Sequence, residues 1–165
     1  MASSRAHGPA PRIALLLAAG LALAACAQPG GRAPMGDPGA VAASSPVYFR
    51  ETVGDRVLFP VDQSSLTPGA QETVAAQARW LSANPGYAAT IEGHADEQGT
   101  REYNLALGAR RAAAVQDYLV AQGVAEARLR TVSYGKERPV AVCSDESCYA
   151  RNRRAVTVLQ GGAGS

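Results

Sequence analysis

The chain has 165 residues, enough for one domain with extensions, and its apolar content of 47% allows a buried core to form. The formal net charge is +2, but Arg5 and Arg12 lie in a segment that we expect to be removed, which reduces the 16 Lys and Arg residues to 14 and balances the 14 Asp and Glu residues. A near-neutral protein lacks the clustered basic face typical of nucleic-acid binding, so the composition argues against a nucleic-acid partner.

The first 25 residues have the pattern of an export signal. Arg5 and Arg12 provide a basic start, and the apolar run over 13–25 is too short to span a bilayer comfortably. A buried core helix is the alternative interpretation, but the N-terminal position and the basic flank argue against it. We therefore expect residues 1–25 to be a signal peptide that is removed on export.

A cysteine follows the apolar run directly, in the sequence Leu23-Ala24-Ala25-Cys26. This sequence resembles the lipobox of bacterial lipoproteins, and the resemblance implies that Cys26 becomes the first mature residue and carries three acyl chains. A single acyl chain binds a membrane only marginally, whereas several anchor a protein stably. By the same resemblance, Ala27 in place of Asp implies the outer membrane. The alternative is an ordinary cleaved signal followed by an incidental cysteine.

Residues 26–46 are interpreted as the lipidated cysteine and a flexible linker. The linker is rich in Pro, Gly, Ser and Ala and lacks the periodicity of a folded element. About 20 such residues reach roughly 65 Å when fully extended and roughly 25 Å as a relaxed coil. This reach suits a domain that is tethered to a membrane and works at a distance from it.

The folded domain is expected over residues 47–160, with a flexible Gly-rich tail over 161–165. Its start has the pattern of a β-hairpin, with strands at 47–52 and 57–59 joined by a turn over 53–56. The hairpin would therefore precede the main body of the domain.

Two helices follow, each with a start and a stop signal. Thr67 and Pro68 suit the N-cap and the first position of a helix that ends at Asn84. The second helix is expected to begin at about residues 100–103, and Gly123 ends it. Apolar residues recur at helical spacing on one face of each helix, and in the second helix that face is polar at its N-terminal end.

Further strands are expected at 87–94, 129–133 and 155–159. The order of the elements predicts an α+β fold: a mixed four-stranded sheet with two main helices packed on one face, preceded by the short N-terminal hairpin. The junction between the strand at 87–94 and the second helix is dense in charge. The free N–H groups at a helix start favour an anion, so this junction is the candidate site.

Two motifs at the junction resemble those of a known family. The sequence Gly-His-Ala-Asp-Glu at 93–97 ends the strand, and the pattern Asn-x-x-Leu-Gly-x-x-Arg-Ala at 104–112 lies on the second helix. Together with 131–139 and 152–156, they make residues 47–160 similar to the peptidoglycan-associated lipoproteins (Pal) of the Tol–Pal system. Pal is a branch of the OmpA-like peptidoglycan-binding family, and the resemblance implies the OmpA-like fold.

The resemblance also implies non-covalent binding of the peptidoglycan stem peptide, chiefly through diaminopimelate, whose end carries an ammonium and a carboxylate. Asp96 matches the family position that accepts from the ammonium, and Arg111 matches the position that clamps the carboxylate with a two-pronged bond. Backbone N–H groups of residues 97–100 would supply further donors. The remaining candidate ligand-binding residues are Asp62, Glu97, Gly99, Thr100, Tyr103, Asn104 and Leu107.

Alternative interpretations remain for several of these residues. Asp96 could serve only as a helix-start cap, with Arg111 only as its partner. Gln98 stands where many Pal sequences have Arg, which puts one family contact in doubt. His94 is interpreted as a packed residue and not as a metal ligand, and Arg153 as a residue that braces the site or solvates its loop. No metal and no cofactor are expected.

Cys143 and Cys148 are the thiols that remain once Cys26 is lipidated. In an exported protein, a pair separated by four residues favours a disulfide that closes a small loop. Zinc is the alternative, but it would need two further ligands, and only His94 is available in type.

The function implied by the resemblance is a tether and not an enzyme. The lipid would hold the outer membrane, the domain would lie in the periplasm and bind the wall, and TolB and possibly TolA would be partners. A peptidoglycan hydrolase or amidase is one alternative, but the sequence offers neither a nucleophile motif nor a pair of metal-binding histidines. Another is an OmpA-like lipoprotein without a Tol partner, which TolB co-purification would distinguish.

Overall fold

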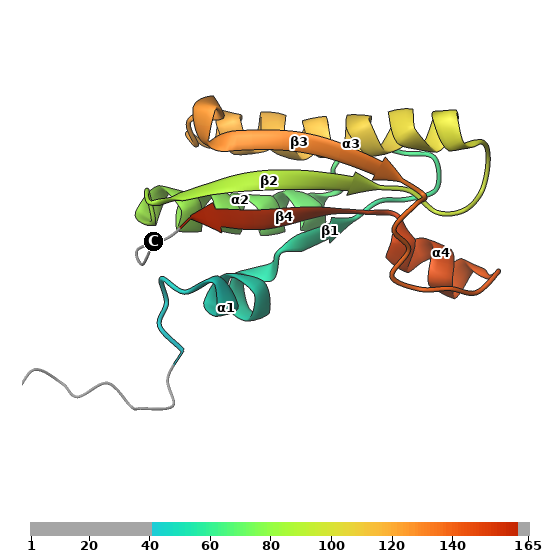
Figure 1. The fold of residues 1–165 in the computed structure, drawn as a ribbon. Helices are drawn as coiled ribbons and strands as arrows, with labels where there is room; N and C mark the ends of the chain where they lie inside the picture. Colours follow the sequence, from blue (N-terminus) through green and yellow to red (C-terminus); the bar gives the residue numbers. More distant parts are fainter. Residues whose placement is uncertain (1–40, 162–165) are drawn as a thin grey trace, which may run out of the picture. The chain divides into compact units, whose positions relative to one another are not determined.

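The computed structural model describes residues 41–161 (Figure 1). The expected signal peptide, Cys26, linker residues 27–40 and tail residues 162–165 lie outside the described residues. In chain order the elements are α1 (Pro46–Tyr48), η1 (Phe49–Gly54), β1 (Arg56–Leu58), α2 (Pro68–Ala83), β2 (Tyr87–His94), α3 (Arg101–Ala121), η2 (Glu126–Arg128), β3 (Leu129–Gly135), α4 (Glu146–Asn152) and β4 (Arg154–Gly161).

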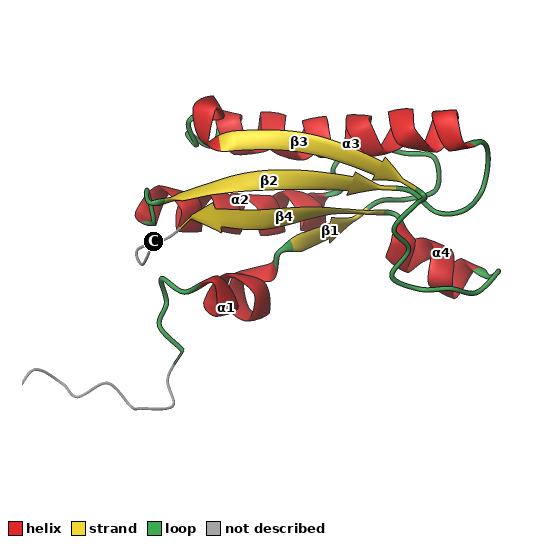
Figure 2. Ribbon diagram, in the orientation of Figure 1, coloured by secondary structure: helices red, strands yellow, loops and turns green. Residues whose placement is uncertain are grey.

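The four strands form one mixed sheet in the order β1-β4-β2-β3 (Figure 2). Strand β4 is antiparallel to both of its neighbours, whereas β2 and β3 are parallel. Helices α2 and α3 cover one face of the sheet (Figure 1). The predicted class, a mixed four-stranded sheet with two main helices on one face, is confirmed.

The core lies between the two helices and the sheet. The helix starts follow the sequence signals, because the Thr67 hydroxyl accepts from the Ala70 N–H and Pro68 occupies the first helical position. Helical spacing predicts buried apolar faces at Ala70, Val74, Ala78 and Leu81 on α2 and at Leu107, Val115 and Leu119 on α3, and all of these residues are buried. Ala112 of α3 is buried as well. Between residues 41 and 161, none of the helices has the length and apolarity that crossing a bilayer requires.

The predicted N-terminal hairpin is wrong, because its first strand is helical. The Ser45 hydroxyl accepts from the Tyr48 N–H, and Pro46 occupies the first helical position, so a helix begins here. Phe49 is 1% exposed and packs on Trp80 with a ring separation of 4.9 Å. The Ser–Pro helix start and burial of Phe49 against α2 outweigh the β-propensity of this segment.

The segment that carries Cys143 and Cys148 contains the short helix α4. The Asp145 side chain caps it by accepting from the Ser147 and Cys148 N–H groups. The chain leaves α4 directly into β4, so α4 lies at the end of the sheet where β4 begins and β2 ends (Figure 1).

Candidate functional site

The start of α3 lies directly on β2 because two glycines face each other. A Cβ on Gly93 would stand 1.8 Å from the Gly108 carbonyl oxygen, and a Cβ on Gly108 would stand 2.9 Å from the Gly93 carbonyl oxygen. Neither position accepts a side chain unless the helix moves away from the strand. The close packing brings the first turns of α3 beside the turn that leaves β2, which is the predicted junction.

A hollow of about 300 Å³ opens at this junction. Its walls come from the loop after β1, the turn after β2 and the first turns of α3. The lining residues are Val61, Asp62, Asp96, Gln98, Gly99, Tyr103, Asn104 and Leu107. The structure therefore brings six predicted site residues together, whereas Glu97, Thr100 and Arg111 are not part of the lining.

A larger hollow of about 400 Å³ lies between α3 and β3. Its charged lining residues are exposed, and two of them, Arg101 and Glu137, pair with each other at 3.3 Å. We assign the candidate site to the smaller hollow because its lining includes a buried carboxylate.

That carboxylate belongs to Asp96, which is 7% exposed. Its Oδ1 accepts from the Gln98 N–H at 3.2 Å, and its Oδ2 accepts from Arg153 Nη1 at 3.0 Å. A cation and a hydrogen bond thus compensate the hydration that this carboxylate has lost on burial. Each oxygen has a further lone pair, so Asp96 can accept another donor. Its cationic partner in the structure is Arg153 and not Arg111.

Arg111 is 0% exposed and joins two walls of the site. Its Nε donates to the Gln63 carbonyl at 2.8 Å, its Nη2 donates to the Pro60 carbonyl at 3.3 Å, and its Nη1 donates to the His94 carbonyl at 2.8 Å. The first two carbonyls lie in the loop after β1, and the third ends β2. The guanidinium also stacks on Phe59, with 5.2 Å between its central carbon and the ring centre.

The charge of Arg111 is desolvated and has no direct carboxylate partner. Burial lowers the pKa of Arg111 to about 10, although the nearby charge of Asp96 opposes this shift. Within residues 41–161, no carboxylate lies at ion-pair distance from this guanidinium. Three of its five N–H groups are used, which leaves two for a ligand. The guanidinium is fully buried and does not line the hollow, so a ligand carboxylate can reach these groups only after a movement of the surrounding residues.

Asp62 and Tyr103 are exposed residues of the lining and contact each other. The Tyr103 hydroxyl donates to the Asp62 carboxylate, and this bond raises the pKa of Tyr103. Asp62 has a φ of +56°, a left-handed conformation that Asp tolerates better than most residues. Its side chain is therefore aimed by a turn in the backbone as well as by Tyr103.

The predicted polar residues of the turn hold its shape. The Thr100 hydroxyl caps α3 by accepting from the Tyr103 N–H at 3.2 Å. Asn104 Nδ2 donates to the Gln98 carbonyl at 2.7 Å, and Lys136 Nζ donates to the Gly99 carbonyl at 2.8 Å. The turn is thus bonded from both α3 and the end of β3.

Glu97 points away from the hollow lining and toward the segment that carries α4. Its Oε1 accepts from the Tyr149 hydroxyl at 3.0 Å and from the Ser144 hydroxyl at 3.2 Å. The predicted contribution of Glu97 to the site can therefore come from its backbone N–H, while its side chain makes a contact that the sequence did not indicate.

His94 is buried beside the site, next to the Tyr134 ring at a centroid distance of 5.6 Å. Burial, together with the charges of Arg154 and Arg138, lowers the pKa of His94 to about 4. Neither ring nitrogen has a hydrogen-bond partner among the described residues. The imidazole is therefore neutral and packed at neutral pH.

Arg153 is the residue that sequence reasoning underrated. It is 4% exposed, and besides Asp96 it bonds the Glu146 carboxylate and donates from Nε to the Phe59 carbonyl at 3.2 Å. Arg153 lies 57 residues from Asp96 in the chain. The only signal in the sequence was a basic pair after a polar loop, which does not distinguish a buried ion pair from a solvated face.

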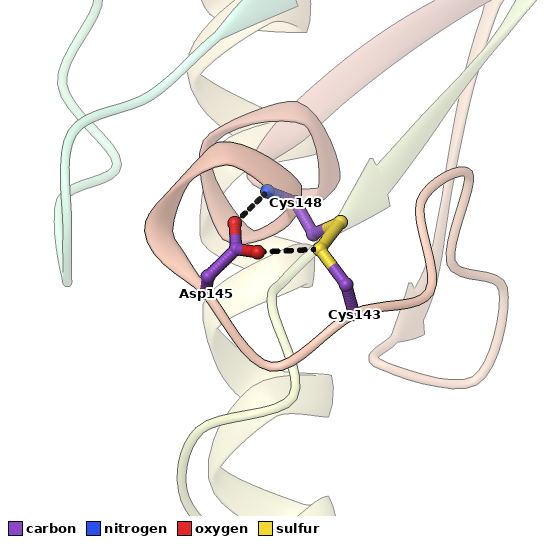
Figure 3. Close-up of side chains that lie close together, drawn as sticks. All are labelled: Cys143, Asp145 and Cys148. Atoms are coloured by element: carbon purple, nitrogen blue, oxygen red, sulfur yellow. Dashed lines mark hydrogen bonds between the residues drawn. A yellow bond between two sulfur atoms is a disulfide. The ribbon is translucent and has the colours of Figure 1, made fainter.

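A disulfide joins Cys143 and Cys148, with 5.7 Å between their Cα atoms (Figure 3). Asp145 lies inside the closed loop, and its Oδ2 stands 3.1 Å from the Cys143 sulfur. These three residues have ligand atoms close enough together for a metal ion, but the two sulfurs are bonded to each other and are therefore unavailable as thiolates.

The fold is that of an OmpA-like domain. The sequence model of the OmpA family matches residues 58–153. The peptidoglycan-associated lipoprotein of Agrobacterium fabrum is 56% identical over 158 residues, which cover 92% of this chain and 88% of the relative. The protein of the same name from Rhizobium meliloti is 59% identical over 150 residues, which cover 88% of this chain and 85% of the relative.

Solved structures agree with these relatives. The crystal structure of the peptidoglycan-associated lipoprotein from Burkholderia pseudomallei has a TM-score of 0.66 and 40% identity, and the match covers 70% of this chain and 100% of that one. The C-terminal domain of Helicobacter pylori MotB shares the fold, with a TM-score of 0.61 at 22% identity over 66% of this chain and 87% of that one. The chain therefore belongs to the OmpA family, in its branch of peptidoglycan-associated lipoproteins. The names of these lipoproteins describe no enzyme.

Proposed function

We propose that this protein is an outer-membrane lipoprotein that binds the diaminopimelate-containing stem peptide of peptidoglycan and tethers the membrane to the wall within the Tol–Pal system. The names of its relatives support an association with peptidoglycan. The proposal rests on two buried charges. The carboxylate of Asp96 lines the hollow, and the guanidinium of Arg111 lies nearby without a carboxylate at ion-pair distance among the described residues.

The two charges suit the end of diaminopimelate, where an ammonium and a carboxylate share one carbon. Asp96 accepts from the ammonium with the lone pairs that Gln98 and Arg153 leave free. Arg111 binds the carboxylate through its two unused N–H groups, which requires the surrounding residues to move. In a site with little water, such charge-assisted bonds are stronger than neutral ones.

The remaining walls fix the position of the ligand. Asp62 adds a second carboxylate to the lining, and Leu107 supplies an apolar surface for the ligand's methylene chain. The first N–H groups of α3, after the cap at Thr100, add donors for a carboxylate. Gly99 and Asn104 complete the lining of the hollow.

The tether follows from the order of the segments. Residues 1–25 direct export, lipid on Cys26 enters the outer membrane, and a linker up to residue 46 lets the domain of residues 47–160 reach the wall in the periplasm. The Trp80 indole donates to the Ala43 carbonyl at 2.8 Å, so the last linker residues lie against α2.

TolB, and possibly TolA, are proposed as protein partners. Three apolar side chains are exposed around the start of α3, namely Val61, Tyr103 and Leu105. Two of them line the hollow, so a protein that covers this rim would compete with the stem peptide. Such competition would allow TolB to release the tether from the wall. A TolB pull-down tests this arrangement, and a loss of bound TolB as peptidoglycan fragment is added would support it.

The direct experiment is sedimentation of the intact protein, solubilised in detergent, with purified diaminopimelate-type peptidoglycan. We expect wild type to pellet with the wall and Asp96→Asn to stay soluble, because losing a buried charge partner costs about 2–5 kcal/mol. Asp117→Asn, an exposed change on the C-terminal half of α3, is the matched control and should pellet like wild type. Circular dichroism must show unchanged folding. Equal pelleting of Asp96→Asn and wild type would rule out this site.

A further inference from the structure

The segment that contains the disulfide contacts the ligand-binding turn, although it lies far along the chain. Ser144 lies within the loop that the Cys143–Cys148 disulfide closes, and Tyr149 follows the second cysteine on α4. Both hydroxyls donate to the same oxygen of Glu97, at 3.2 Å and 3.0 Å. One side of the turn is thus held by residues that line no part of the hollow.

The other contact runs through Arg153, which follows α4 directly. Arg153 Nη1 donates to Asp96 at 3.0 Å and to the Glu146 carboxylate at 3.3 Å, and Nη2 donates to Glu146 as well. The pair lowers the pKa of Glu146 and keeps this exposed carboxylate charged. Glu146 is the first residue of α4, so the guanidinium connects the helix start to the carboxylate that the ligand would meet.

Contacts within the segment that carries α4 fix both of its ends. The disulfide and the Asp145 cap fix the start of α4. The Asn152 side chain accepts from the Val140 and Ala141 N–H groups at 2.9 Å and 3.1 Å and donates to the Ala141 carbonyl at 2.8 Å. These closures link the contacts of the segment to one another, so we expect the loss of one contact to weaken the others.

We propose that residues 143–153, the disulfide-closed arm, are a positioning element of the ligand site, in which Glu146, Tyr149 and Arg153 hold Asp96 and Glu97 in the binding geometry. This inference rests on the proposed function of the hollow. No residue of the arm lines the hollow. The arm raises the fraction of molecules whose turn is ready to bind, and the apparent dissociation constant rises as that fraction falls.

Three changes test the arm on the intact protein in detergent. Tyr149→Phe removes one hydroxyl, Glu146→Gln removes one charge, and the double change Cys143→Ser with Cys148→Ser opens the loop. We expect affinity for purified peptidoglycan, measured by sedimentation, to fall about threefold for each single change and about tenfold for the double change, in line with the loss of partly exposed contacts.

Two matched controls should bind like wild type. Tyr118→Phe alters a half-buried tyrosine of α3 whose hydroxyl makes no hydrogen bond among the described residues. Glu126→Gln alters an exposed acid at the start of η2 with no ion pair in the described part of the chain. These controls separate the arm from any general effect of losing a hydroxyl or a charge.

A second readout reports the turn without any ligand. The Gln98 N–H donates to Asp96, so its amide resonance senses the position of that carboxylate. We expect the Gln98 resonance to shift in the three arm variants and to stay in place in both controls. Normal binding by the arm variants with an unmoved Gln98 resonance would overturn the inference. Absence of binding by wild type would instead overturn the proposed function, and with it the inferred effect on affinity.

Discussion

Gly93→Ala is expected to force α3 away from β2. The added Cβ would stand 1.8 Å from the Gly108 carbonyl oxygen, whereas ordinary contacts begin at 3.4 Å. The shortfall, 3.4 minus 1.8, is 1.6 Å. The obstructing atom belongs to the helix backbone and cannot rotate aside, so the first half of α3 must move by about that distance.

The cost exceeds that of an ordinary overpacked side chain. Inserting one methyl group into a filled core typically costs about 1–3 kcal/mol. Here a helix would shift, and the bond from Arg111 to the His94 carbonyl, next to the substituted residue, would stretch. We therefore expect the free energy of unfolding to fall by about 3 kcal/mol or more. Gly69→Ala is the matched control, because nothing lies within 4 Å of its added Cβ and alanine favours the helix.

Urea denaturation followed by circular dichroism measures the effect. With a slope of about 1–3 kcal/mol per molar urea, the midpoint of Gly93→Ala should drop by at least about 1 M, whereas Gly69→Ala should match or exceed wild type. Peptidoglycan binding should weaken in the same variant because the two walls of the hollow separate. A midpoint for Gly93→Ala equal to that of wild type would refute the inferred contact between helix and strand.

Three further changes test other parts of the site. Arg111→Met leaves three carbonyls without their donor and should lower the free energy of unfolding by about 3 kcal/mol in urea denaturation, and an unchanged midpoint would contradict the observed bonds. Thr100→Ala removes the cap of α3 and should cost about 1 kcal/mol in the same assay, so a neutral effect would argue against the cap. The pKa of His94 is lowered from 6.5 to about 4, so between these pH values the imidazole is protonated in the unfolded chain and neutral in the folded protein. The free energy of unfolding should therefore keep the full contribution of His94 above pH 6.5 and lose it as the pH falls toward 4. His94→Gln should flatten this decline in denaturation curves recorded across that range, and an identical pH dependence in both proteins would count against a buried neutral imidazole.

The sequence was a good guide where the information is local. Thr67 with Pro68, and Gly123 after the second helix, mark helix ends by their own backbone and side-chain chemistry, and the structure has the helices there. The Ser45–Pro46 start is the same kind of signal. The apolar residues that follow it suggested a strand, because their burial against Trp80 was not visible in the sequence.

The site was predictable only in part, for a related reason. Motif spacing placed Asp96 and Tyr103 on adjoining elements, and the structure has both at one hollow. The partners of the two central charges are not local. Asp96 pairs with Arg153, which follows α4. Arg111 donates to the carbonyls of Gln63 and Pro60, which lie 48 and 51 residues earlier in the chain. No periodicity or motif encodes a bond to a carbonyl, because every residue has one.

The most direct measurement is calorimetric titration of the intact protein, solubilised in detergent, with two stem peptides that differ only at the third residue. One peptide contains diaminopimelate and the other contains lysine, which has the same ammonium but lacks the neighbouring carboxylate. If Asp96 and Arg111 bind the two charges, the diaminopimelate peptide should bind at least about 30-fold more tightly, corresponding to about 2 kcal/mol for one desolvated charge contact. Equal affinity for both peptides, or no heat with either, would contradict the assignment of this hollow as a diaminopimelate site.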